Sequence, residues 1–68
     1  MNNENFNMSI RSFLKMVGVG SQREIEHAVA KAIAKGHLKG NEKLPVNVML
    51  TISDAELNVS FDGIIELD

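Results

Sequence analysis

The 68-residue sequence contains no cysteine, no tryptophan and no tyrosine, and only one proline. Without cysteine, neither a disulfide nor a thiolate zinc site can stabilise the chain. A chain this short buries only about 60% of the surface that its unfolded form exposes, and small domains without crosslinks often gain stability by oligomerising. We therefore expect one small domain spanning residues 1–68, with residues 1–5 frayed.

Long apolar runs are also missing. None approaches the roughly 20 residues that a membrane-spanning helix needs. Residues 1–9, MNNENFNMS, lack the basic and then apolar regions of a signal peptide. These absences predict a cytoplasmic protein.

Recognisable catalytic motifs are absent as well. The chain has no P-loop, no G-x-S-x-G and no paired-carboxylate motif. Gly18-Val19-Gly20 lacks the remaining glycine of a dinucleotide-binding loop, and His27 and His37 have no metal-ligand spacing. We therefore predict no catalytic residue, no cofactor and no metal, and a protein that is not an enzyme.

Charge is divided unevenly along the chain. Residues 1–43 hold all seven Lys and Arg against four Glu, whereas residues 44–68 hold five acidic residues and no Lys or Arg. Such a division favours a charged partner, or a fold whose helical and sheet layers carry opposite signs.

Residues 21–35 carry the clearest helical pattern. Ser21 and Glu24 match the S-x-x-E capping box, and Gly36 stands where a left-handed residue ends a helix. One face is apolar and consists of Ile25, Ala28, Val29, Ala32 and Ile33. Residues 36–45 then form a predicted loop.

The polar side of this helix carries a cationic row, which consists of Arg23, His27, Lys31 and Lys35. Like charges four residues apart repel by about 0.2–0.5 kcal/mol per pair in an isolated helix. The functional interpretation is a contact with an anion or an acidic partner. A solvated face is the favoured interpretation, because most charge rows are simply hydrated.

A first helix is predicted over residues 3–17, with Gly18-Val19-Gly20 as the connection to the second. Its apolar stripe consists of Phe6, Ile10, Phe13, Leu14 and Val17. A second strip consists of Met8, Ser12 and Met16. This strip suits either a partner, since Met adapts to irregular surfaces, or incidental exposure or packing against the second helix.

Strict alternation predicts strands in the last third of the chain. Residues 46–52 and 57–61 form a hairpin about Asp54-Ala55 that pairs Ile52 with Leu57, Leu50 with Val59, and Val48 with Phe61. Asp62-Gly63 is a turn signal, which predicts a third strand over residues 64–67. Its register is open, and we prefer the one that turns Ile65 and Leu67 to the core.

These elements predict an α+β fold, with two helices packed on one face of a three-stranded antiparallel meander. The uncovered sheet face has no charge and consists of Asn47, Met49, Thr51, Asn58 and Ser60. The edge strands contain no Lys and no Pro, the usual protections against strand addition. Either a second copy or an unidentified protein partner covers the sheet or pairs with an edge, or a monomer leaves a mildly polar face open. We favour a homodimer.

Four segments carry a resemblance: FNMSIR at 6–11, SQREIEHAV at 21–29, GHLKGNEKLP at 36–45 and FDG at 61–63. They resemble a family of short bacterial proteins catalogued only as a domain of unknown function. The resemblance implies a bacterial, stand-alone protein, and supplies no activity and no site residues.

The function expected from the sequence is a small non-enzymatic protein-interaction module that self-associates through its sheet face or edge. The alternative is nucleic-acid binding through the basic face of the second helix. An acidic chain without aromatic residues among its basic ones argues against that alternative. The partner itself cannot be named from the sequence.

Overall fold

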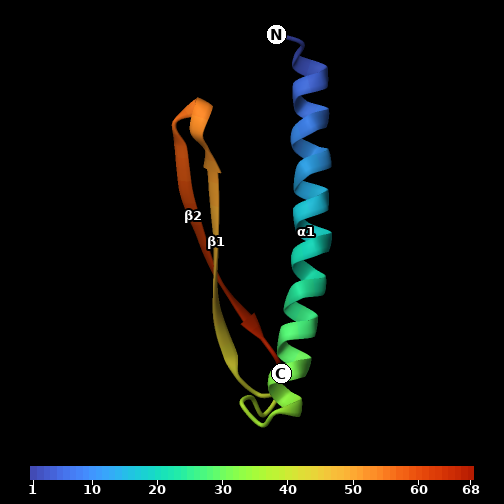
Figure 1. The fold of residues 1–68 in the computed structure, drawn as a ribbon, viewed down its shortest axis with the longest axis vertical. Helices are drawn as coiled ribbons and strands as arrows, with labels where there is room; N and C mark the ends of the chain where they lie inside the picture. The colour runs from blue at the N-terminus through green and yellow to red at the C-terminus, as the bar shows by residue number, and fades with distance from the viewer. The chain divides into compact units, whose positions relative to one another are not determined.

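The computed structural model describes all 68 residues, which form one helix and one β-hairpin (Figure 1). Helix α1 spans Asn3–Ala34, strand β1 Lys43–Ile52, the 3-10 turn η1 Ser53–Ala55, and strand β2 Leu57–Glu66. The predicted arrangement of two helices and three strands is therefore wrong, although the chain does combine helix with antiparallel strands. The chain divides into two units, Met1–His37 and Leu38–Asp68, each described by itself below.

Helix α1 runs without interruption through the predicted connection at Gly18-Val19-Gly20. Ser21 therefore lies in the helix interior and caps nothing. The N-cap is Asn2, whose side-chain oxygen accepts a 3.0 Å hydrogen bond from the Asn5 backbone N–H. Glycine inside a helix costs about 1 kcal/mol relative to Ala, which weakens a helix of 32 residues without ending it.

The apolar stripes of the two predicted helices are in phase, which explains their fusion. Val17, Ser21, Ile25 and Val29 follow one another at intervals of four residues across the glycines, and all four are half-buried. A single helix keeps these positions on one face, whereas a turn at Gly18 would have broken the line.

The end of α1 follows the prediction for Gly36. Gly36 adopts the left-handed conformation (φ 81°), its N–H donates to the Ile33 carbonyl, and the His37 N–H donates to the Ala32 carbonyl. These two bonds form a Schellman motif, which satisfies carbonyls that the last helical turn leaves free. Lys31 in the last turn and Lys35 at the C-cap lie near the negative end of the helix dipole.

The hairpin has the predicted register at all three predicted pairs. Ile52 lies opposite Leu57, Leu50 opposite Val59, and Val48 opposite Phe61. Its tip is closed by η1 and by Glu56, whose φ of 52° is left-handed and whose N–H donates to the Ser53 carbonyl. The turn predicted at Asp54-Ala55 is confirmed.

The predicted third strand does not exist, because β2 continues straight through Asp62-Gly63. Gly63 has no positive φ, which a tight Asp-Gly hairpin turn requires. Strand β1 begins at Lys43, inside the predicted loop, and so is long enough to pair with β2 as far as Glu66. Asp62 then lies opposite Asn47, whose side-chain amide donates to its carboxylate at 2.9 Å.

The ladder also fixes which backbone groups point out of the hairpin. The Leu67 N–H donates to the Glu42 carbonyl at 3.0 Å, so this pair is hydrogen-bonded. Hydrogen-bonded and non-bonded pairs alternate along an antiparallel ladder. Leu44–Ile65 and every second pair after it, as far as Ile52–Leu57, are therefore hydrogen-bonded. The odd residues of β1 and the even residues of β2 therefore direct their N–H and C=O groups to the free edges.

No side chain is buried anywhere in the 68 residues. Phe13 is 47% exposed and Phe61 58% exposed. Neither the helix nor the hairpin encloses a core of its own, which leaves the apolar surface of both units available for contact. The expectations of one domain and of fraying in residues 1–5 remain predictions.

Candidate functional site

One face of the hairpin is entirely apolar. Side chains alternate between the two faces of a strand, so the even residues of β1 share a face with the odd residues of β2. This apolar hairpin face consists of Leu44, Val46, Val48, Leu50 and Ile52 with Leu57, Val59, Phe61, Gly63 and Ile65. Five of the ten residues are half-buried and the others are exposed. The face can bind another apolar surface, and it offers no group for chemistry.

The five residues predicted as an interface lie together on the opposite face. Met49 faces Ser60 and Thr51 faces Asn58 in the register, and Asn47 faces Asp62. All five are exposed, and Met49 is 64% exposed. The prediction that this face carries no charge is wrong, because the longer strands add Lys43, Asp62 and Glu66 to it.

The two free edges of the hairpin differ. Strand β1 includes Pro45, so the prediction of an edge strand without proline fails for β1. Pro45 faces Ile64 at a non-bonded position, where its nitrogen points to the free edge and offers no N–H. The free edge of β2 has an N–H at every outward position from Asn58 to Glu66. Strand addition is therefore easier along β2 than along β1.

The cationic row is present on the single helix. Arg23, His27 and Lys31 are exposed residues of α1, and Lys35 is the exposed C-cap. None of these side chains takes part in the side-chain hydrogen bonds of the structure. The row is thus free to contact an anionic surface. The separate second helix to which the prediction assigned this row does not exist, because the row lies on the single helix α1.

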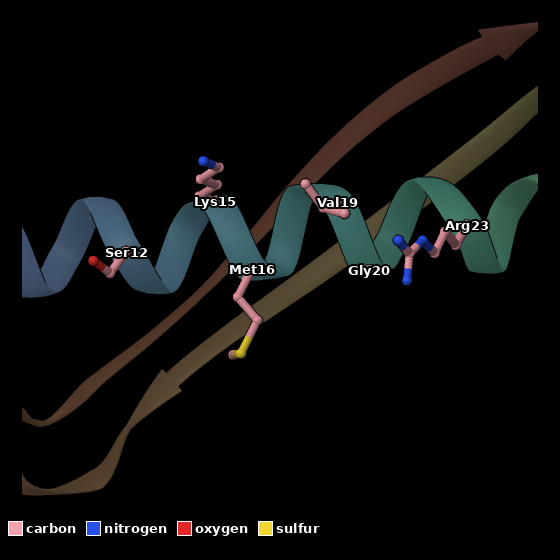
Figure 2. Close-up of a pocket in the computed structure, with 6 residues that line it drawn as sticks. All are labelled: Ser12, Lys15, Met16, Val19, Gly20 and Arg23. Atoms are coloured by element: carbon pink, nitrogen blue, oxygen red, sulfur yellow. The ribbon is translucent and has the colours of Figure 1, made fainter.

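A shallow groove of about 470 Å³ lies along the middle of α1. Figure 2 shows the six residues that line it: Ser12, Lys15, Met16, Val19, Gly20 and Arg23. It includes Ser12 and Met16 from the strip noted in the sequence. A Cβ on Gly20 would meet no atom within 4 Å, so the missing side chain helps to open the groove. The spacing of Ser12, Met16 and Gly20 at four residues is the signal that could have located it.

The loop before β1 is organised by Glu42, which the sequence analysis did not single out. Its carboxylate accepts backbone N–H bonds from Lys39 (2.8 Å), Gly40 (2.9 Å) and Asn41 (3.2 Å). The pKa of Glu42 is lowered, first by the Lys39 N–H and then by the Gly40 N–H. Gly40 has a φ of 105°, which suits glycine. The loop is therefore a folded turn with a structural carboxylate.

The structure shows neither a metal-binding cluster nor a membrane-spanning helix. No three His, Cys, Asp or Glu side chains come together in a way that could hold a metal ion. Helix α1, despite its length, is not apolar enough to cross a membrane.

Comparison with known proteins gives a family and no activity. No curated protein and no solved structure matches the chain. The model of one protein family matches residues 1–68, the whole chain, in agreement with the resemblance noted in the sequence. The chain belongs to the family of unknown function DUF6494.

Proposed function

We propose that this protein is a small non-enzymatic interaction module that works as a homodimer. The observation that carries the proposal is that neither unit encloses a core of its own, although the helix has an apolar stripe and the hairpin an apolar face. Monomeric soluble proteins rarely expose large contiguous apolar patches, and such patches usually mark interaction sites.

Each unit by itself lacks the tertiary packing that would stabilise it. A two-stranded hairpin is marginal in water, and most of a helix's stability in proteins comes from packing of its apolar face. Full burial of a Val, Leu, Ile or Phe side chain contributes about 1.5–3 kcal/mol. Cover for the apolar faces is therefore the main stabilisation that either unit needs.

The lengths of the elements support a second copy as the source of that cover. A helix of 32 residues is about 48 Å long, whereas a strand of ten residues spans about 33 Å. The helix is thus longer than one hairpin by about ten residues. Apolar side chains extend along α1 from Phe6 to Ile33, and a second copy supplies further apolar surface for them to contact.

Light scattering at micromolar concentration tests the proposal. The expected mass is twice the chain mass of 7.5 kDa. A mass of one chain that does not change with concentration would refute self-association.

The alternative function is nucleic-acid binding through the cationic row. What supports it is that Arg23, His27 and Lys31 are exposed at four-residue intervals on one continuous helix. A gel shift with random duplex DNA at low salt should then show a complex that Arg23→Glu with Lys31→Glu abolishes, because phosphate contacts dominate such affinity. Free DNA at every protein concentration would eliminate this alternative.

A further inference from the structure

We infer that two copies join through the free edges of their β2 strands, antiparallel, about a two-fold axis at Phe61. The product is a four-stranded sheet in the order β1-β2-β2-β1. The inference rests on the proposed self-association and names the surface that carries it.

The backbone selects β2 over β1. Bonds to a neighbouring strand need outward N–H groups in series, and β2 supplies them at Asn58, Ser60, Asp62, Ile64 and Glu66. Strand β1 lacks the donor at Pro45, and its edge begins with Lys43. Both residues are devices that proteins use to block strand addition.

Symmetry selects β2 as its own partner. Pairing of β2 with the β1 edge of the next chain would repeat from chain to chain and give a filament or a larger ring. Pairing of β2 with β2 uses the same edge twice and closes after two chains. The blocked edge at Pro45 is then left on the outside of the sheet, where it prevents further growth.

The side chains select one register. The apolar faces of the two copies lie on the same side of the joined sheet only when odd-numbered residues pair with odd-numbered residues and even-numbered with even-numbered. Two such registers centre on the middle of β2, at Phe61 and at Asp62. The second places Asp62 directly opposite its own copy, and like charges in that position are destabilising.

The register centred on Phe61 gives favourable pairs on both faces. On the apolar side, Phe61 meets Phe61 of the second copy, and Leu57 meets Ile65. On the other side, Ser60 meets Asp62, where the hydroxyl can donate to the carboxylate. The remaining like-charged pairs, Glu56 of each copy with Glu66 of the other, lie at the two ends of the paired strands, where these side chains are exposed. Two apolar hairpin faces then merge into one.

A proline scan of the two edges tests the choice of strand. Ser60→Pro removes an outward N–H from β2 and leaves the β1–β2 ladder intact. The matched control is Met49→Pro, because Met49 lies directly opposite Ser60 and its N–H points to the other edge. We expect Ser60→Pro to weaken dimerisation at least about tenfold, since two hydrogen bonds per dimer are lost, and Met49→Pro to change it by less than about twofold.

Cysteine crosslinking tests the register. Its result does not depend on whether the hairpin tolerates a proline. The chain has no native cysteine, so oxidised Phe61→Cys can form a disulfide only with itself. Residues facing each other at a non-bonded position are about 4.5 Å apart between Cα atoms, within disulfide range. The control is Val48→Cys, opposite Phe61 on β1, whose two copies would lie about 14 Å apart across three strand spacings.

The expected result is a covalent dimer for Phe61→Cys and none for Val48→Cys on a non-reducing gel. Equal crosslinking of both variants, or dissociation by Met49→Pro with no effect of Ser60→Pro, would overturn the β2 edge. Light scattering could also show a dimer that neither proline variant weakens and that Phe61→Cys does not crosslink. That outcome would overturn pairing through the β2 edge, while leaving self-association standing. A monomer of the unmodified chain would refute both.

Discussion

At the scale of single residues, Glu42 controls the loop between the two units. Three successive backbone N–H groups converge on its carboxylate, and they bind the charged form in preference to the neutral one. The lowered pKa means that this stabilisation is fully present above the ordinary value of 4.5 and is lost as the pH falls through the lowered pKa.

The pH dependence of the loop is therefore predictable. In NMR, the amide signals of Lys39 and Gly40 should shift together on acidification, with a midpoint below 4.5, as the carboxylate is protonated. Glu42→Gln should abolish this transition, and the control Glu66→Gln, which lies outside the loop, should leave it unchanged. A midpoint at or above 4.5 would show that the N–H groups do not favour the charged carboxylate.

Glycines show how residue-level prediction succeeds and fails. Gly36 was placed correctly, because helix periodicity ended just before it and its left-handed φ followed from that position. Gly18 and Gly20 were misplaced, since glycine weakens a helix by an amount that a long apolar stripe can offset. Composition alone does not distinguish the two situations.

At the scale of elements, the end of α1 depends on Gly36. Gly36→Ala should lower the free energy of unfolding by about 1–2 kcal/mol, because a side chain disfavours the left-handed conformation. The matched control Gly18→Ala should raise it by about 0.5–1 kcal/mol, since the added methyl meets no atom within 4 Å. Thermal unfolding followed by circular dichroism measures both. Equal effects of the two variants would contradict the assigned C-cap.

The pairing of the strands near the hairpin tip was predicted correctly, whereas the number of strands was not. Alternation of apolar residues determined the register near the tip, where Ile52, Leu50 and Val48 have the partners expected. The third strand was wrong because Asp62-Gly63, a frequent turn signal, lies inside the continuous strand β2. Extending β1 back to Lys43 gives Asp62 a partner in Asn47, which a tight turn at Asp62-Gly63 would not. That extension was not predicted, because Pro45 is typical of a loop.

At the scale of the whole molecule, the sequence predicted mixed helix and antiparallel strand, and missed how little the chain encloses. The expected two-layer fold required two short helices above three strands. One helix and two strands provide fewer surfaces to pair, and no side chain becomes buried. The interface residues Asn47, Met49, Thr51, Asn58 and Ser60 do share a face, but that face is the less apolar of the two. Their role as an interface stays a prediction.

The apolar face of the hairpin links the survival of the protein to its concentration. On the proposed homodimer, copies at low numbers would remain open to proteases, and the fraction protected by pairing would rise with concentration by mass action.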